Sequence, residues 1–255
     1  MAQKARVENE LERLLKEKVI SPVQFSDWAA PVVPVIKGDG SVRICGDFKV
    51  TVNKYAKVEK YPLPLVEDLF ASLTGGQCFT KLDLANAYLQ LLVEEKSKEY
   101  LTINTHKGLF RYNRLPFGVA SAPAMFQRTM ESLLQGLKHV AVYIDDILIT
   151  GQSEADHLRT LEEVLGRLEA AGMRLKAAKC SFMQKEVIYL GHRITSKGIY
   201  PAAEKLRAIK DAPAPQNTQQ LRSFIGLINY YSKFLPNLAS QLAQLYSLLA
   251  KDKAW

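Results

Sequence analysis

The sequence predicts an α+β protein with a smaller, purely helical part at its C-terminal end. Two observations predict this fold class. Strand-like runs and amphipathic helix patterns alternate as far as about residue 195, and from about Ser196 onward only helix patterns remain. The chain has 255 residues, 47% hydrophobic and 24% charged, enough for a substantial core and for two or three subdomains.

The N-terminal half of the chain begins with a helix pattern and continues with strands. Val7, Leu11 and Leu14 recur at helical spacing, and the helix is expected to end before Ser21-Pro22. The next predicted elements, in order, are two strands over 30–48 around a turn at Gly38-Asp39-Gly40, an extended proline segment and short helix over 60–76, a strand over 78–84, and a hairpin over 100–115.

The C-terminal half predicts further helices around one more hairpin. Ser121 can cap a helix that has Pro123 in its first turn and Phe126 and Met130 on its apolar face. The remaining predicted elements are a hairpin over 140–149, a longer helix over 153–172, a strand over 187–195, and a helical tail with apolar residues Leu221, Phe224, Ile225, Ile228, Leu238, Leu242, Leu245 and Leu249.

Composition favours some classes of protein over others. The net charge of +8 favours an anionic partner, nucleic acid first and an anionic membrane second, although many proteins are mildly basic. The three cysteines show no CxxC spacing and the four histidines no zinc pattern, so we expect reduced thiols in an intracellular protein. No apolar run approaches the roughly 18 residues of a membrane span, and the N-terminus has the pattern of a charged amphipathic helix rather than a signal peptide.

Two adjacent carboxylates interrupt the most apolar hairpin of the sequence, "VYIDDILIT". Asp145 and Asp146 stand at or next to its turn, where burying unpaired negative charge is costly. A solvated turn is one explanation, because Asp is a common turn residue. The apolar flanks and the lack of a turn glycine favour a central hairpin with a special role.

A third carboxylate, Asp83, ends the alternating strand "FTKLDL". If this strand neighbours the hairpin in one sheet, Asp83 and the Asp145-Asp146 pair converge, and divalent cations would relieve their repulsion. Hard oxygen ligands of this kind suit Mg²⁺, and two such ions can catalyse phosphoryl transfer. The residues alone leave the metal site and the solvated turn equally open.

Six segments in order resemble the reverse transcriptase family. "VYIDDILI" resembles the YxDD hairpin, "TKLDLANAYLQL" the strand with the first catalytic aspartate, "RLPFGVASAPAMFQRTM" the LPxGxxxSPxxFQ segment, "VRICGDFKVTVNKY" the fingers strand, and "VIYLGHRIT" the primer grip. Residues 221–249 resemble the thumb of gypsy-type long-terminal-repeat retrotransposons. The chain resembles the polymerase part of a gypsy-type or retroviral pol polyprotein.

The resemblance implies a right-hand polymerase with an antiparallel palm sheet backed by helices. The family usually continues into a ribonuclease H domain, but this sequence has no further carboxylate cluster, so we expect a polymerase without a ribonuclease H domain. The expected subdomains are fingers over 1–54 and 91–121, palm over 55–90 and 122–196, and thumb over 197–255.

The resemblance also implies the chemistry. Asp83, Asp145 and Asp146 match the three catalytic carboxylates, and the carbonyl of Leu84 matches a further metal ligand. Two Mg²⁺ ions, with Mn²⁺ as a substitute, would support attack of a primer 3′-hydroxyl on a deoxynucleoside triphosphate. The implied partners are an RNA or DNA template with its primer and the deoxynucleoside triphosphates, with no membrane and the oligomeric state left open.

Other matched positions would contact the nucleotide and the primer. Lys37 and Arg43 match basic fingers residues on the triphosphate, and Tyr88 matches the aromatic gate against a ribose 2′-hydroxyl, although such an aromatic is more often core. The other nucleotide contacts implied are Asn86, Ala87, Phe117 and Tyr143, and the primer contacts are Ile144, Leu190 and Gly191. Phe117 departs from the Gln of many retroviral enzymes, which favours packing over a polar contact.

Two other hypotheses remain beside polymerisation. The chain could be a repurposed element product that binds nucleic acid without polymerising, or a metal-dependent nuclease or nucleotidyl cyclase on a similar palm. The fingers and primer-grip segments disfavour the second of these. The resemblance implies a cytoplasmic protein. Virus-like particles and the nucleus are further locations that it allows.

Overall fold

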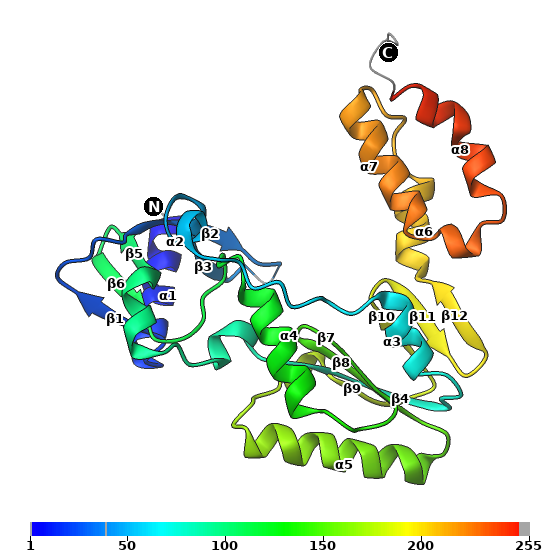
Figure 1. Cartoon of the computed structure of the whole chain (residues 1–255), viewed down its shortest axis with the longest axis horizontal. Coiled ribbons are helices and arrows are strands. Elements are labelled where there is room, and N and C mark those ends of the chain that lie inside the picture. Colours follow the sequence, from blue (N-terminus) through cyan, green and yellow to red (C-terminus); the bar gives the residue numbers. More distant parts are fainter. Residues whose placement is uncertain (1, 39, 250–255) are drawn as a thin grey trace.

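The computed structural model describes residues 2–38 and 40–249 (Figure 1). Asp39 of the expected turn and residues 250–255 of the expected thumb lie outside the described residues. The chain forms three regions: an N-terminal region with its own sheet, a central region built on a second sheet, and a helical tail. The central region joins the other two (Figure 1).

The N-terminal region is a five-stranded sheet in the order β1-β6-β5-β2-β3, with helix α1 (Ala2–Lys16) packed on it. Leu11 and Leu14 of α1 are buried against Ile103 and Tyr112 of the sheet, which confirms the apolar stripe expected from the sequence. The strands are β1 (Ile20–Val23), β2 (Ala30–Ile36), β3 (Val42–Gly46), β5 (Thr102–Thr105) and β6 (Gly108–Tyr112), with the short helix α2 (Val52–Tyr55) beside them.

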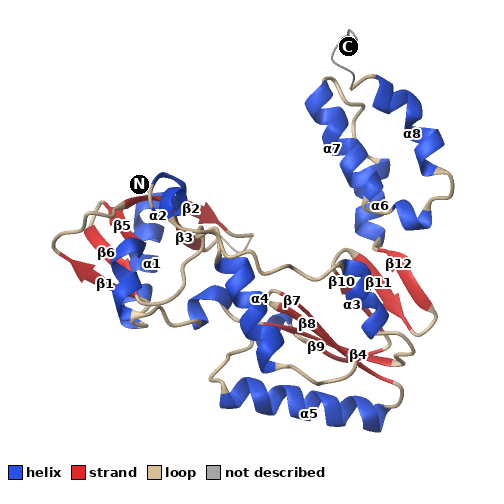
Figure 2. Ribbon diagram, in the orientation of Figure 1, coloured by secondary structure: helices blue, strands red, loops and turns tan. Residues whose placement is uncertain are grey.

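The central region is a four-stranded antiparallel sheet in the order β7-β8-β4-β9. Its strands are β4 (Cys78–Asp83), β7 (Val140–Tyr143), β8 (Asp146–Gly151) and β9 (Ser181–Gln184). Helices α4 (Ala122–Leu133) and α5 (Glu154–Ala170) cover one face, and α3 (Val66–Ser72) packs on the other (Figure 2).

Alternation along β4 decides which side chains meet the helices. Leu82 is buried in the cluster with α4 and α5, whereas Phe79 belongs to the cluster on the opposite face, as the alternating pattern predicted. Lys81 and Asp83 share the face of Phe79 because side chains at i and i+2 point the same way. The carboxylate of Asp83 therefore lies on the face away from α4 and α5.

The strand expected over 187–195 was only partly right. It is two strands, β10 (Glu186–Tyr189) and β11 (His192–Thr195), joined by a tight turn at Leu190-Gly191, and β12 (Gly198–Pro201) continues the sheet beyond the residue where strands were expected to end. Leu190 and Gly191 have φ of +46° and +73°. Apart from one glycine, these residues carry no turn signal, so their pattern predicts a continuous strand instead of the reversal.

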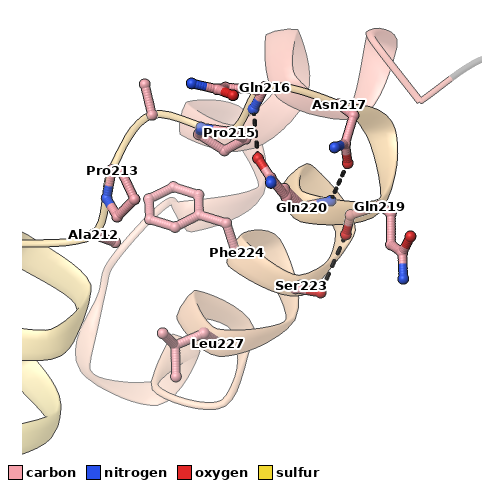
Figure 3. A pocket seen from close by; sticks show the side chains of 11 residues that line it. Ala212, Pro213, Pro215, Gln216, Asn217, Gln219, Gln220, Ser223, Phe224 and Leu227 are labelled. Atoms are coloured by element: carbon pink, nitrogen blue, oxygen red, sulfur yellow. Dashed lines mark hydrogen bonds between the residues drawn. The ribbon is translucent and has the colours of Figure 1, made fainter.

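The helical tail consists of α6 (Ala203–Lys210), α7 (Thr218–Asn229) and α8 (Leu238–Ser247), with a small core of Leu221, Ile225, Leu238 and Leu242. The start of α7 is well capped: the Oδ1 of Asn217 accepts from the backbone N–H of Gln220 at 2.9 Å (Figure 3). Among the described residues, no helix has both the length and the apolar character needed to cross a bilayer.

Besides β12, two edge strands are not predicted by the sequence pattern. β1 contains Ser21-Pro22, a pair that predicts only the end of the preceding helix, and it lies at the edge of its sheet, where proline is tolerated. β9 is also an edge strand, and it pairs with β4 through an irregular register. Short edge strands carry weak periodicity because only four residues define the pattern.

Candidate active site

The structure brings Asp83 next to the Asp145-Asp146 pair. The register of β4 and β8 sets Asp83 directly opposite Asp146, and that of β7 and β8 sets Tyr143 opposite Asp146. Ile144 and Asp145 are therefore the two turn residues, and Asp146 begins β8. The backbone N–H of Leu84 donates to the carbonyl of Asp145 at 3.2 Å, which ties the end of β4 to the turn.

Two of the three carboxylates are neutralised by lysines. The Nζ of Lys179 lies 3.0 Å from Oδ2 of Asp83, and the Nζ of Lys81 lies 3.1 Å from Oδ1 of Asp146. Asp145 is in no such ion pair among the described residues. Burial, and then the negative charges of Asp146 and Asp83, raise the pKa of Asp145 above its usual range. Asp145 is therefore the carboxylate of this cluster that lacks an ion pair of its own among the described residues.

The donor set suits a hard divalent cation. Within residues 2–38 and 40–249, no group of three acidic, histidine or cysteine side chains is arranged to hold a metal ion. Asp83 and Asp146 each form an ion pair with a lysine. Those two ammonium groups stand where cations would neutralise the carboxylates. Carboxylates alone, with no sulfur or imidazole beside them, are the donors that Mg²⁺ prefers.

A cavity of about 820 Å³ opens beside these carboxylates. It lies between the β2–β3 hairpin of the N-terminal region and the end of β4 in the central region. Most of the predicted site residues line it: Lys37, Arg43, Asp83, Leu84, Asn86, Ala87, Tyr88, Phe117 and Asp145. The cavity combines acidic groups at one end with basic groups at its sides, which fits a polyanionic ligand that carries its own metal ions.

Aromatic rings and a guanidinium form one wall of this cavity. The Cζ of Arg43 lies 4.3 Å from the ring centroid of Phe117, and the ring of Phe117 lies 5.1 Å from that of Tyr88. Tyr88 in turn meets Phe126 of α4 edge to face at 5.5 Å. Burial, and then the charge of Asp145, raise the pKa of the Tyr88 hydroxyl. The wall is therefore a continuous stack from the N-terminal region to the core of the central region.

The backbone next to Tyr88 is unusual. Asn86 has φ of +55°, in the left-handed region that Asn tolerates better than most residues, and a short 3-10 helix, Ala87–Gln90, follows it. The side chain of Gln90 donates to the carbonyls of Ala85 and Arg174 at 2.7 and 3.0 Å. These bonds hold the bend that turns the chain from β4 towards the cavity.

Sequence reasoning missed three lining residues: Gly38, Lys176 and Lys179. The two lysines belong to the loop between α5 and β9, and the backbone N–H of Lys176 donates to the carbonyl of Asp83 at 2.8 Å. The only signal in the sequence was a basic run, "RLKAAK", without a recognisable motif. Contact between Lys179 and Asp83 spans 96 positions, so local pattern could not reveal it.

Five predicted residues lie outside this cavity: Tyr143, Ile144, Asp146, Leu190 and Gly191. Tyr143 lines a smaller cavity of about 310 Å³ together with residues of α3 and of the end of α7. The turn at Leu190-Gly191 lies beside that second cavity, where the hydroxyl of Tyr230, one of its lining residues, donates to the carbonyl of Leu190 at 2.7 Å. Tyr143, predicted as a nucleotide contact, thus lies apart from the other predicted nucleotide contacts and lines the second cavity instead.

A third cavity, of about 740 Å³, lies in the helical tail (Figure 3). It is lined by the segment that connects α6 to α7 and by Phe224 and Leu227 of α7. None of its lining residues is ionisable, and the first turn of α7 is already capped by Asn217. It therefore offers neither charge for a phosphate nor ligands for a metal.

Comparison with known proteins agrees with this geometry. A model of the family described as reverse transcriptase (RNA-dependent DNA polymerase) matches residues 35–194, which include all three carboxylates. An uncharacterised protein of Caenorhabditis elegans is 41% identical over 231 residues, and the Tf2-3 transposon polyprotein of Schizosaccharomyces pombe is 38% identical over 229 residues. The matches cover 90% and 89% of this chain but only 18% and 17% of those two proteins.

Solved structures show the same fold. The foamy viral protease-reverse transcriptase in complex with double-stranded DNA matches 98% of this chain and 44% of that chain, with a TM-score of 0.92 and 27% identity. The same viral protein in complex with an RNA/DNA hybrid matches with a TM-score of 0.85 over 98% of this chain and 34% of that chain. The expected right-hand polymerase fold is confirmed, and the chain belongs to the reverse transcriptase (RNA-dependent DNA polymerase) family.

Proposed function

We propose that this chain is an RNA-directed DNA polymerase of a gypsy-type retrotransposon pol, which adds deoxynucleotides to a primer 3′ end. The observation that carries the proposal is the single cavity that unites Asp83 and Asp145 with Arg43 and Tyr88. Homology to a transposon polyprotein and structural similarity to a viral reverse transcriptase bound to nucleic acid support it. We expect the enzyme to copy DNA templates in addition to RNA templates.

Asp83, Asp145, Asp146 and the carbonyl of Leu84 are the groups that would hold two Mg²⁺ ions, with Mn²⁺ as a substitute. Bound metal would supply charge neutralisation at the attacking and leaving oxygens of the transferred phosphoryl group. The chain's own contribution is to hold these ligands in register, because Asp83 faces Asp146 across a regular antiparallel ladder. A nucleotide would then be positioned by the protein and not by the metal alone.

Basic residues reach the cavity from two sides. Lys37 and Arg43 come from the β2–β3 hairpin, and Lys176 and Lys179 come from the loop before β9. Arg binds phosphate oxygens bidentately and Lys acts as a mobile point charge, so the four side chains are suited to a triphosphate. Arg43 is also restrained by its stack on Phe117, which reduces the entropy lost on binding.

Tyr88 would exclude ribonucleotides. Its ring is wedged between Phe117 and Phe126, so it has little freedom to move away from a 2′-hydroxyl. Asn86 and Ala87 would line the same sugar pocket. This assignment makes deoxynucleotide selection a matter of packing, since no polar side chain is needed to reject the extra oxygen.

We assign the N-terminal region to the fingers (1–54 and 91–121), the central region to the palm (55–90 and 122–196), and the tail to the thumb (197–255). The primer would lie along the second cavity, against Tyr143, Ile144 and the turn at Leu190-Gly191. Template and primer contacts there would be mainly to the backbone of the nucleic acid and would weaken as salt rises.

Primer extension on an RNA template with Mg²⁺ tests the proposal. Wild type should extend the primer, and Asp145→Asn should not, whereas Asp211→Asn, an exposed aspartate at the end of α6, should extend normally. If wild type binds template–primer in a salt-sensitive way but incorporates no nucleotide with Mg²⁺ or Mn²⁺, the chain is a nucleic-acid-binding protein and the proposed polymerase activity is wrong. Cleavage of a labelled primer would instead indicate a nuclease.

A further inference from the structure

The turn that carries Asp145 has a backbone conformation that its sequence disfavours. Ile144 has φ of +55°, in the left-handed region. A β-branched residue is rarely found there, because its side chain crowds the following carbonyl. Such conformations persist only where the surrounding structure holds them in place, and they cluster at functional sites. The hairpin alone therefore does not explain the shape of its own turn.

The side chain of Gln127 supplies the missing restraint. It comes from α4 and has 0% exposed surface. Its Oε1 accepts from the backbone N–H of Ile144 at 2.6 Å, and its Nε2 donates to the carbonyl of Val142 at 2.9 Å. A single amide thus binds the backbone on both sides of Tyr143. Removing it would leave a half-buried donor at Ile144 and a buried acceptor at Val142 unpaired.

Glu131 and Tyr61 determine which way this amide points. The Nε2 of Gln127 also donates to Oε1 of Glu131 at 2.6 Å, and Oε2 of Glu131 accepts from the hydroxyl of Tyr61. An ionised carboxylate only accepts hydrogen bonds, so the NH₂ end of the amide must face Glu131. The oxygen is then left for the N–H of Ile144. In the reverse orientation, the amide oxygen would face the oxygens of Glu131 and Val142, and the amide NH₂ would face the N–H of Ile144.

The segment over 57–65 carries Tyr61 past α4 on its way from α2 to α3 (Figure 1). Two further contacts attach it to that helix. The backbone N–H of Glu59 donates to the hydroxyl of Ser121 at 2.9 Å, and the carboxylate of Glu59 lies 3.3 Å from the Nη1 of Arg128. Ser121 therefore binds this segment instead of capping α4 as the sequence had suggested.

We propose that Gln127, oriented by Glu131 and Tyr61, is a positioning residue that holds the Ile144-Asp145 turn in its strained shape and so places Asp145 in the nucleotide cavity. The inference rests on the proposed function, because it concerns the same site. None of the three side chains lines the cavity, so they act only through the turn. Their loss should impair the chemical step while leaving the grip on template–primer intact.

Hydrogen exchange at the backbone amide of Ile144 tests the clamp without any catalysis. This amide should be protected in wild type and in Glu131→Gln, which can still accept from Gln127. Protection should fall by about tenfold or more in Gln127→Met and in Glu131→Leu, since opening of the turn is no longer opposed. Gln135→Met, at an exposed glutamine just beyond α4, is the matched control and should keep wild-type protection. Unchanged protection in Gln127→Met would overturn the clamp.

Steady-state kinetics then tests the positioning. In Gln127→Met, kcat should fall by about 100-fold, as expected when a reacting group is misplaced by about 1 Å, with the Kd for template–primer unchanged. Glu131→Leu, a change at a half-buried side chain, should also lower kcat without changing the Kd for template–primer, but by a smaller factor. It provides a second test of the proposal if Gln127→Met does not fold. A parallel loss of melting temperature, template–primer binding and kcat would show a merely structural role and refute positioning.

Glycine at position 144 provides a rescue. Because glycine adopts positive φ without a steric penalty, Ile144→Gly added to Gln127→Met should recover part of the lost kcat. No recovery would mean that strain in the turn is not what Gln127 opposes, which contradicts the proposal. If wild type itself extends no primer, the proposed function fails, yet hydrogen exchange still decides whether the clamp exists.

Discussion

Two tight turns in this protein look alike but are held in different ways. The turn at Ile144-Asp145 joins β7 to β8, and the turn at Leu190-Gly191 joins β10 to β11. Each begins with a bulky residue at positive φ, +55° at Ile144 and +46° at Leu190. Each is also held by side chains from elsewhere in the chain, because the bulky first residue of each turn does not favour positive φ by itself.

The difference lies in where the holding side chains come from. The first turn is bound by Gln127 of α4, which belongs to the same core as the hairpin. The second is bound by Tyr230 and Tyr231 at the end of α7, whose hydroxyls donate to the carbonyls of Leu190 and Gly191 at 2.7 and 3.0 Å. The first turn is therefore fixed to the central sheet, whereas the second is coupled to the position of the helical tail.

This contrast fits the proposed division between the chemical step and the binding of the primer. Under the proposed function, the first turn would carry a reacting carboxylate in a fixed frame. The second turn, which is linked to the helical tail, would contact the primer. The largest and smallest effects of mutation should follow this division.

The largest effect is expected at the first turn. Asp145→Asn should lower the rate of nucleotide incorporation by about 1,000-fold, because it removes a negative ligand from the cluster. Single-turnover kinetics measures this rate, and filter binding should show an unchanged Kd for template–primer. Mg²⁺ with nucleotide should also raise the melting temperature of wild type much more than that of the variant. Weaker template–primer binding in Asp145→Asn would contradict the separation of the chemical step from nucleic-acid binding.

The next effect is expected at Gly191. A Cβ there would lie 2.9 Å from the hydroxyl of Tyr231, at a φ of +73° that favours glycine. Gly191→Ala should cost about 1–3 kcal/mol in the free energy of unfolding and weaken template–primer binding. Gly226→Ala in α7 is the control: its Cβ meets nothing within 4 Å, so the helix should gain about 0.5–1 kcal/mol. Chemical denaturation measures both, and equal stability of the two variants would contradict the prediction.

A smaller effect is expected when the two tyrosine hydroxyls are removed. The double variant Tyr230→Phe and Tyr231→Phe keeps both rings but loses the bonds to the second turn, each worth about 1 kcal/mol. Template–primer should bind more weakly, and dissociation during synthesis should be more frequent, while single-turnover incorporation stays close to wild type. A selective loss of the chemical step would show that the second turn also positions reacting groups.

The smallest effect is a pH dependence of the second turn. His192 is buried among Phe70, Tyr230 and Tyr231, and its Nδ1 bonds to the carbonyl of Leu190. Burial lowers the pKa of His192; the bond to Leu190 and, more weakly, the charge of Glu67 oppose this shift, and the charge of Lys233 adds to it.

The sign of this dependence follows from proton binding in the two states. As the pH falls below about 6.5, the unfolded chain binds the proton first, so stability is complete above that pH and declines below it. Thermal unfolding of wild type and of His192→Gln between pH 7.5 and 5, values chosen around that pKa, measures the difference. The difference in stability between wild type and His192→Gln should shrink as the pH falls. A constant difference would show that His192 is not the source of the pH dependence.

Local pattern in the sequence was enough for much of the fold. Alternation along β4 placed Lys81 and Asp83 on one face and Leu82 on the other, and the apolar stripe of α1 gave its buried side, as the structure confirms. Such patterns can be recognised because side chains repeat every 2 residues in a strand and every 3.6 residues in a helix, so a few residues define the pattern. Edge strand β1 and the reversal at Leu190-Gly191 escaped this reading, since short elements leave too few repeats to detect.

The pattern of the sequence places Asp83 at the end of a strand and Asp145 and Asp146 at or next to the turn of a hairpin, in a reverse transcriptase pattern. Folding brings Lys179 to Asp83 and the amide of Gln127 to the backbone of Ile144, and no pattern predicts either contact. Strands and turns are encoded by neighbours in the chain, whereas a lysine 96 positions away becomes a partner only after the sheet has folded and brought its loop to the end of β4.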